Sequence, residues 1–369
     1  MYERGAIRDA VVDCLRDMGR DAAIDEIVVA VTARLGAVPQ SSVRSYLNLN
    51  TPALFERTRR GRYRLRGVAA VECAPIELSA QIDRATLHRA DAFGWLAAQP
   101  PKSIHAIVTD PPYGIVEYSA EEKAKLREGK GGVWRIPPSF DGHKRAPLPR
   151  FTVLSNDDHK ALASFFRRLG TLLLRACVPG ANVIVASNPL LSHIVARAMS
   201  ETGLELRGYI ARQVMTMRGG DRPKNAHEEF EGVSVMPRSQ WEPWVVLRTP
   251  LEGRVQDNLR RYGVGGFRRL STNKPFGDVI RSHPTPAKEK KIAPHPSLKP
   301  QAFMRSIVRA SLPLETGIVC DPFAGAGATL AAANAVGYAS VGVEIDRDYY
   351  DLALASVPRL AALKVEPES

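Results

Sequence analysis

Seven short apolar runs, separated by stretches with helical spacing, constrain the fold of the second part of this 369-residue chain. The runs are ATLHRAD, IHAIVTD, NVIVASN, LRGYIARQVM, PWVVLRTP, GIVCDPF and ASVGVEID. Strands that alternate with helices are typical of a doubly wound, mostly parallel sheet. We therefore predict an α/β domain with a seven-stranded sheet over residues 86–369. Its ligands should lie beyond the carboxyl ends of the strands.

The first 66 residues have a different pattern. Apolar side chains recur at helical spacing over 7–18 and 24–35, and a third helix is expected after Pro39 with Ser41 as its N-cap. The run LFERTRRGRYRLR then alternates like a hairpin that turns near Arg60 and Gly61. Three helices and a basic hairpin predict a winged-helix-like DNA-binding module over 1–66. Residues 67–85 lack a clear period, which predicts a linker.

The expected DNA contacts of this module fall into two groups. Hairpin arginines would neutralise phosphates, and polar side chains of the third helix would reach base edges. The residues are Arg57, Arg59, Arg60 and Arg62 for phosphates, and Arg44 and Asn48 for bases. A small helical interaction domain with a solvated basic hairpin is the alternative.

The charge balance also indicates a polyanionic partner. The chain has 51 Lys and Arg against 39 Asp and Glu, a formal net charge of +12. This balance favours nucleic acid, although a merely soluble basic protein would share it. Four scattered cysteines without a C-x-x-C pair predict neither a disulfide framework nor a metal site. No apolar run reaches roughly 18 residues and no secretory signal is evident, so we expect a cytoplasmic protein without a membrane partner.

Long stretches near 115–152 and 217–294, the second around the run PWVVLRTP, look like loops that carry many basic residues. Long loops in a compact domain are usually functional or disordered. We expect both to lie along DNA, and an unstructured basic insert is the alternative.

The stretch TDPPYG (109–114) follows one of the apolar runs directly. Pro111 and Pro112 have no N–H to donate, so they end the strand and stiffen the loop. Asp110 and Tyr113 are thereby held at the edge where such a sheet binds its ligand. These four residues are the candidate catalytic residues.

A second motif, GIVCDPFAGAGATL, has the pattern of a nucleotide-type site. A strand leads into Asp321, Phe323 and the glycine pair Gly325 and Gly327, and a helix follows. Glycines let a backbone approach a ligand closely. Glu344, at the end of the next strand, lies where an acidic side chain takes ribose hydroxyls. Since a third glycine at dinucleotide spacing and a G-K-[ST] are missing, a phosphate-free adenosine compound fits better than a dinucleotide.

Taken together, TDPPYG, HPSLKP (295–300) and CDPFAGAGAT resemble the S-adenosylmethionine-dependent amino-methyltransferases of DNA. The order, with DPPY first and the glycine motif last, is similar to their permuted β group. The resemblance implies a Rossmann-like sheet in which Asp321, Phe323, Gly325 and Gly327 line the cofactor. It further implies that Glu344 holds the ribose. The remaining implied cofactor contacts are Ser297 and Lys299 at the methionyl end, and Asp91 at the adenine edge.

The implied reaction transfers a methyl group to an exocyclic base amine in double-stranded DNA. Asp110 and the Pro111 carbonyl would each accept an N–H of the amine, which frees its lone pair, while Tyr113 stacks on the base. The base must first be flipped out of the duplex. Asp110 favours adenine, because cytosine-N4 members more often carry serine there.

Several alternatives stay open on the sequence. They are a cytosine-N4 methyltransferase, an RNA or protein-glutamine methyltransferase, and a DNA-binding regulator whose catalytic domain has lapsed. Relatives of the β group are often dimers, so a homodimer is a further possibility. A role in restriction–modification or defence, with partner proteins, is also open, and the recognition sequence cannot be read from one chain.

Overall fold

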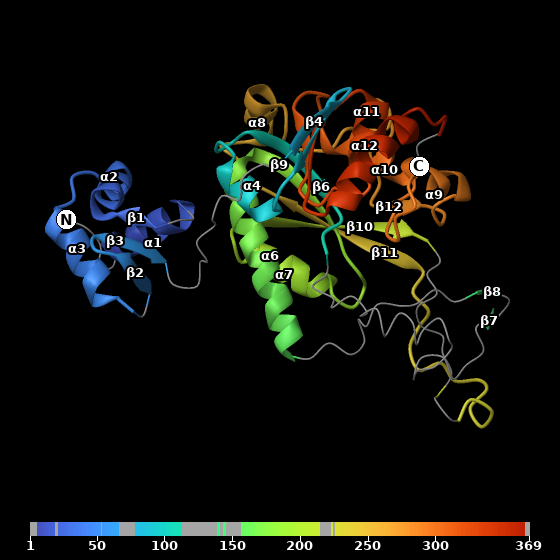
Figure 1. Ribbon diagram of the computed structural model, residues 1–369, viewed down its shortest axis with the longest axis horizontal. Helices are drawn as coiled ribbons and strands as arrows, with labels where there is room; N and C mark the ends of the chain where they lie inside the picture. Colours follow the sequence, from blue (N-terminus) through green and yellow to red (C-terminus); the bar gives the residue numbers. More distant parts are fainter. Residues whose placement is uncertain are drawn as a thin grey trace.

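A computed structural model of the protein describes residues 6–18, 21–52, 54–65, 78–112, 139–140, 143–144, 156–214, 223 and 226–365. Two parts of the chain, 6–65 and 78–365, form separate hydrophobic clusters. Figure 1 shows the elements of both parts.

The N-terminal part consists of three helices and a small antiparallel sheet in the order β1-β3-β2. Its elements are α1 (Ala6–Met18), β1 (Ala22–Ala23), α2 (Ile24–Leu35), α3 (Gln40–Leu49), β2 (Phe55–Arg59) and β3 (Arg62–Leu65). Val11, Leu15, Ile27 and Leu47 are fully or almost fully buried between the helices. The predicted helices and hairpin are therefore present, and the turn falls at Arg60 and Gly61 as expected.

The predicted N-cap of the third helix is wrong. Helix α3 begins at Gln40, one residue before Ser41, and Pro39 occupies the N-cap position without a side-chain hydrogen bond. A proline at a helix start is favourable because its φ is already helical and its missing N–H would be unpaired there anyway.

The large part is built on one sheet of nine strands in the order β12-β10-β11-β9-β6-β13-β14-β5-β4 among the described residues. The strands are β4 (Leu78–Ile82), β5 (Ala85–Arg89), β6 (Ile104–Thr109), β9 (Cys177–Ala186), β10 (Glu205–Gln213), β11 (Trp241–Arg248), β12 (Val279–Arg281), β13 (Ile318–Asp321) and β14 (Ala339–Glu344). A separate short pair is formed by β7 (Ser139–Phe140) and β8 (His143–Lys144). The central strands β9, β6, β13, β14 and β5 are mutually parallel, and β11 and β4 are antiparallel to their neighbours.

The mostly parallel α/β sheet is confirmed, but its predicted size is not. All seven expected runs are strands, and two more, β4 and β12, lie at the outer edges. Strand β4 pairs with β5 from Leu78 to Ile82, inside the range predicted as a linker. The linker prediction is thus wrong for 78–85, and the sheet begins before residue 86. Edge strands such as β4 and β12 are short and half exposed, so they lack the apolar run of a central strand.

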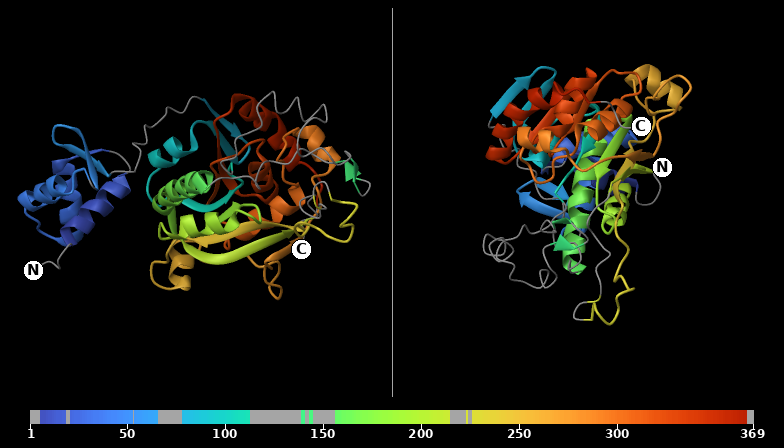
Figure 2. Two further views of the ribbon diagram at one scale, coloured as in Figure 1. Left: turned by 90° about the horizontal axis from the view of Figure 1, so that it is seen from below. Right: turned by 90° about the vertical axis from the view of Figure 1, so that its right-hand side faces the viewer.

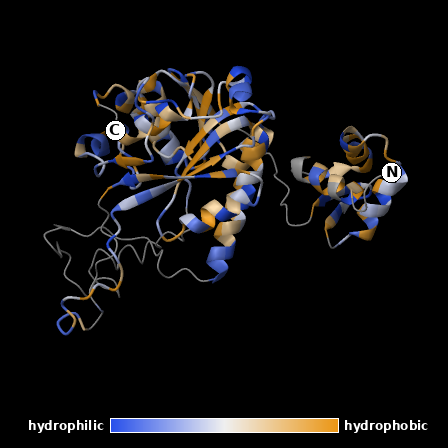
Figure 3. Ribbon diagram, turned by 180° about the vertical axis from the view of Figure 1, so that it is seen from behind, coloured by the Kyte–Doolittle hydropathy of each residue, from blue (hydrophilic) through white to orange (hydrophobic). Residues whose placement is uncertain are grey.

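Helices cover both faces of this sheet, as Figures 1 and 2 show. One face carries α10 (Gln301–Ser311), α11 (Ala328–Val336) and α12 (Arg347–Ala361); the other carries α4 (Ala92–Ala98), α6 (Asn156–Ala176) and α7 (Ser192–Ser200). Two further helices, α8 (Val255–Tyr262) and α9 (Ala287–Ile292), lie in the connections. Central strand β9 is buried along its whole length, which explains why its sequence is a continuous apolar run. Figure 3 shows hydrophobic residues concentrated in these strands.

The parallel strands β5, β6, β9, β13 and β14 end at one edge of the sheet, called here the carboxyl edge. Asp91, Asp110, Asp321 and Glu344 all lie at or directly after these strand ends. None of the helices in the described part of the chain combines the length and hydrophobicity needed to span a bilayer.

Candidate active site

The catalytic loop begins where β6 ends at Thr109. Asp110 follows as a half-buried side chain, Pro111 is buried and Pro112 is exposed. Tyr113 lies outside the described residues. The chain therefore presents a carboxylate and a stiff proline pair at the carboxyl edge, as the sequence predicts.

Asp110 is held in an ion pair from the opposite side of the site. The Lys299 ammonium lies 2.7 Å from Asp110 Oδ2 and 3.0 Å from Glu242 Oε1. All three side chains are largely buried, with 15–20% of each exposed. Burial alone would lower the pKa of Lys299, but the carboxylates of Asp110 and Glu242 outweigh it and the pKa is raised. The lysine is therefore a firmly charged neighbour of the catalytic loop.

Glu242 and Arg212 extend this contact into the sheet. They face each other across the antiparallel pair β10 and β11, and Arg212 donates to Glu242 Oε2 at 2.7 Å. Arg212 also donates to Ser282 Oγ at 3.0 Å and to the His283 carbonyl at 2.8 Å. Burial would raise the pKa of Glu242, yet Lys299 and Arg212 outweigh that effect and lower it.

Neither Arg212 nor Glu242 was among the residues expected from sequence. A charged residue inside each of two apolar strands, YIARQVM and QWEPWVV, was the signal that could have found them. Charged side chains in buried strands are rarely tolerated without a partner.

The loop after β13 is organised around the Asp321 carboxylate. The hydroxyls of Thr109 and Thr329 donate to its two oxygens at 2.6 Å each, and the Phe323 N–H donates at 3.1 Å. The side chain is 3% exposed, and burial raises its pKa to about 6 against the opposition of these three donors. Because Thr109 directly precedes Asp110, this carboxylate ties the glycine loop to the catalytic loop.

Glu344 closes the same loop from the end of β14. It accepts the Gly325 N–H at 2.8 Å and the Asp346 N–H at 2.8 Å. Gly325 and Gly327 have φ values of +50° and +80°, which disfavour any side chain. A Cβ at Gly327 would lie 2.3 Å from Val357 Cγ2, so the loop packs closely on α12. Since a carboxylate has about four lone-pair sites, Glu344 can accept further donors such as hydroxyls.

Comparison with known proteins identifies this arrangement. The family model for DNA methylases, N6_N4_Mtase, matches residues 104–355, more than half of the chain. The chain belongs to the DNA methylase family. The predicted relationship to amino-methyltransferases of DNA is thus confirmed, and the motif order agrees with the predicted β group.

Individual relatives of this methylase are distant. The Type II methyltransferase M2.DpnII of Streptococcus pneumoniae is 23% identical over 273 residues, which cover 72% of this chain and 87% of that protein. M2.LlaDCHI of Lactococcus lactis subsp. cremoris is 23% identical over 274 residues, with 73% and 88% covered. A similar solved structure is TTHA0409 of Thermus thermophilus, a proposed DNA modification methylase complexed with S-adenosyl-L-methionine; it has a TM-score of 0.46 and 20% identity, and covers 75% of this chain and 95% of that one.

The remaining predicted cofactor residues of the methylase lie around the same loops. Phe323 is half buried with its ring 5.8 Å from that of Phe165 and 6.2 Å from that of Phe93. Asp91 caps α4 by accepting the Gly94 N–H at 2.7 Å, so one of its oxygens has a structural role. The Ser297 N–H donates to His295 Nδ1 at 3.2 Å. Lys299 differs from expectation in its partners, which are carboxylates.

The predicted DNA contacts of the N-terminal part are mostly exposed. Arg44, Asn48, Arg57, Arg59 and Arg60 are exposed side chains on α3 and the hairpin. The carboxamide oxygen of Asn48 nevertheless accepts the Tyr63 hydroxyl at 2.9 Å. Arg62 forms an ion pair with Asp21 at 2.9 Å. These two residues thus have partners within the protein.

The predicted basic loops have separate locations. Most of 115–152 and part of 217–294 lie outside the described residues. Within 251–274, Leu251 and Gly265 approach Gly180 near the start of β9, and the Asn182 amide donates to the Gly266 carbonyl at 2.8 Å. Helix α8 therefore lies at the edge opposite to Asp110, and its position does not support a DNA contact at the catalytic loop. In Figure 1 it lies at the top of the domain.

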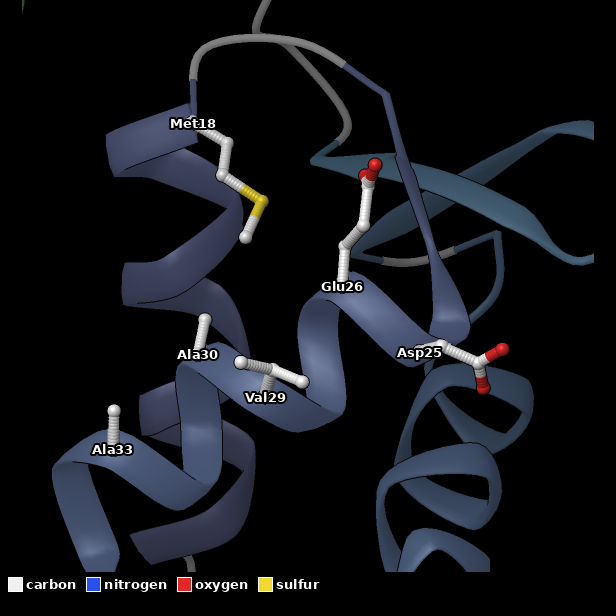
Figure 4. Close-up of a pocket in the computed structure, with 6 residues that line it drawn as sticks. All are labelled: Met18, Asp25, Glu26, Val29, Ala30 and Ala33. Carbon is white, nitrogen blue, oxygen red and sulfur yellow. The ribbon is translucent and has the colours of Figure 1, made fainter.

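A hollow of about 560 Å³ lies between α1 and α2 of the N-terminal part, as Figure 4 shows. It is lined by Met18, Asp25, Glu26, Val29, Ala30 and Ala33. None of these residues belongs to the methylase motifs, so the hollow is distinct from the candidate site. Within the described residues, no group of three or more His, Cys, Asp or Glu side chains could hold a metal ion.

Proposed function

We propose that this DNA methylase transfers a methyl group from S-adenosyl-L-methionine to the exocyclic N6 amine of adenine in duplex DNA. The observation that carries the proposal is the position of Asp110. Its carboxylate lies at the end of β6, directly after the threonine that bonds Asp321 of the glycine loop. A base acceptor and a cofactor loop are thereby neighbours at one edge of the sheet.

Asp110 and Pro111 would act on the target amine. The lone pair of an exocyclic amine is delocalised into the ring, so the nitrogen is a poor nucleophile. When the Asp110 carboxylate and the Pro111 carbonyl each accept one N–H, the lone pair is localised on nitrogen. Pro111 and Pro112 hold these acceptors in place before the base arrives, which removes a reorganisation cost from the reaction. Tyr113 would stack on the flipped base.

The cofactor residues fit an adenosine compound with an amino-acid tail. Glu344 accepts hydroxyl groups well, and the positive φ of Gly325 and Gly327 keeps the loop free of side chains. S-adenosyl-L-methionine would supply an electrophilic methyl group on a sulfonium. Asp321, Phe323, Gly325, Gly327 and Glu344 would hold it, with Asp91 and Ser297 at its two ends.

Adenine is favoured over cytosine because Asp110 is an aspartate where cytosine-N4 methylases more often carry serine. The alternative is a cytosine-N4 methylase with the same geometry. We further expect the N-terminal part, 1–66, to be a winged-helix-like module that binds DNA. Relatives are named Type II methyltransferases, which supports a role in restriction–modification. A homodimer, defence partners and a cytoplasmic location stay predictions.

Identification of the methylated nucleoside tests the proposal. The full-length protein is incubated with S-adenosyl-L-methionine labelled in its methyl group and with duplex DNA of diverse sequence, and the DNA is digested to nucleosides. Labelled N6-methyldeoxyadenosine is expected. Labelled N4-methyldeoxycytidine would support the alternative base, and label only with RNA or protein substrates would replace DNA as the target. Failure of every substrate to take up label would favour the lapsed regulator.

A further inference from the structure

Four charged side chains form a buried chain that begins at the catalytic carboxylate. In order they are Asp110, Lys299, Glu242 and Arg212, joined by N···O distances of 2.7, 3.0 and 2.7 Å. They come from the end of β6, from the turn before α10, from β11 and from β10. The chain is electrically balanced, with two acids and two bases.

Lys299 is shared between two acids. An ammonium close to a single carboxylate would concentrate its charge there and weaken that carboxylate as a hydrogen-bond acceptor. Here Glu242 lies 3.0 Å away and attracts the same ammonium from the other side. Asp110 therefore keeps an oriented, ionised carboxylate that is only partly neutralised.

Arg212 holds Glu242 in this position. Only 6% of its side chain is exposed, and it donates to Glu242, Ser282 and the His283 carbonyl at 2.7–3.0 Å. Its guanidinium also lies 5.2 Å from the centre of the Phe303 ring at the start of α10. A fork with this many donors satisfied fixes a carboxylate more firmly than a single contact would.

We propose that Glu242 and Lys299 are positioning residues that orient and partly neutralise Asp110 for methyl transfer, and that Lys299 does not serve mainly as a cofactor contact. This inference rests on the proposed function, because it assigns a role in that reaction. Buried ion pairs contribute little to stability when compared with apolar replacements, so a buried four-charge chain at an active site indicates a functional requirement.

The test compares Glu242→Gln, Lys299→Met and the double variant with a matched control. Glu205→Gln is the control, since Glu205 pairs with Arg248 across the same two strands at 2.5 Å, near the opposite end of the pair. Each full-length protein is measured for single-turnover methyl transfer, for the KM of DNA and for the Kd of S-adenosyl-L-methionine. The free energy of unfolding checks that each variant is folded.

We expect Glu242→Gln to lower the transfer rate by about 10- to 100-fold, with the cofactor Kd and the KM within about threefold of wild type. Glu205→Gln should stay within about twofold of the wild-type rate. Residues that act as one unit are non-additive, so the double variant should be no slower than Lys299→Met alone. A merely structural effect of Glu242 would instead multiply with that of Lys299.

Two results would overturn the inference. One is a Glu242→Gln enzyme as fast as the Glu205→Gln control; the other is a Lys299→Met enzyme with an unchanged rate and a cofactor Kd more than about tenfold weaker. Absence of transfer by the wild type with every substrate would sink the proposed function instead. The ion chain would then still be tested by the coupling of the Asp110→Asn and Lys299→Met variants in unfolding experiments.

Discussion

Asp321 is the side chain whose environment departs most clearly from that of a free carboxyl group. It is buried beneath the glycine loop and its pKa is raised to about 6. A carboxyl that is easier to protonate in the native state stabilises the protein at low pH and loses that contribution as the pH rises. Its contribution is fully present below about pH 4 and is lost as the pH passes 6.

Asp321→Asn should remove this pH dependence. An amide keeps the shape of the carboxyl group and cannot ionise, so the variant should gain stability relative to wild type as the pH rises. Between about pH 4 and pH 8 the difference in free energy of unfolding should grow by roughly 3 kcal/mol. Urea denaturation of both proteins without ligand at several pH values measures it. Parallel stability curves for the two proteins would show that Asp321 has an ordinary pKa.

The glycine loop and α11 illustrate how a local element is specified. Gly327 precedes α11 and Gly337 follows it, with φ values of +80° and +81°. The two differ in their surroundings. A Cβ at Gly327 would lie 2.3 Å from Val357 of α12, whereas one at Gly337 would meet nothing within 4 Å.

Alanine substitutions at these two glycines should therefore differ. Gly337→Ala should cost about 1 kcal/mol of unfolding free energy, the expense of a left-handed alanine alone. Gly327→Ala adds a steric clash and should cost about 3 kcal/mol or more, with weakened binding of S-adenosyl-L-methionine. Thermal denaturation and cofactor titration measure both effects. Equal losses at the two positions would contradict the close packing of the loop on α12.

Central elements were predictable from sequence, while edge elements and cross-strand pairs were not. The runs that became β6, β9, β13 and β14 are continuous and apolar because both faces are covered. Strands β4 and β12 lack such runs, because an edge strand is partly exposed and owes its place to backbone pairing. The motif residues could be found because their spacing is local. The contact of Glu242 with Lys299 joins residues far apart in the sequence, so no local pattern reveals it.

Positive charge is distributed over the methylase at places with different environments. On the N-terminal hairpin Arg57, Arg59 and Arg60 are exposed, while Arg62 and Arg64 lie in ion pairs with Asp21 and Glu56. Helix α8 carries another exposed set at the edge opposite to the catalytic loop. Its members are Arg254, Arg260 and Arg261. The two sets allow a comparison at constant net charge.

Replacing the three exposed hairpin arginines by glutamine should weaken DNA binding and its salt dependence. Each lost phosphate contact lowers the slope of log affinity against log salt by about 0.9, so the slope should fall by about 3. The same change at Arg254, Arg260 and Arg261 should leave the slope nearly unchanged. Fluorescence anisotropy over a salt series measures both. Equal losses in the two triple variants would mean that overall charge, and not the hairpin, binds DNA.

The proposed chemistry depends above all on Asp110. Replacing it by alanine removes the carboxylate that is to accept the base amine, while the glycine loop and Glu344 stay in place. Single-turnover transfer of a labelled methyl group from S-adenosyl-L-methionine to duplex DNA is the direct measurement, with cofactor affinity as the control for folding. We predict a rate about 10³-fold or more below wild type with the cofactor Kd within about threefold. An Asp110→Ala protein that transfers methyl groups at the wild-type rate would contradict the assignment of the active site.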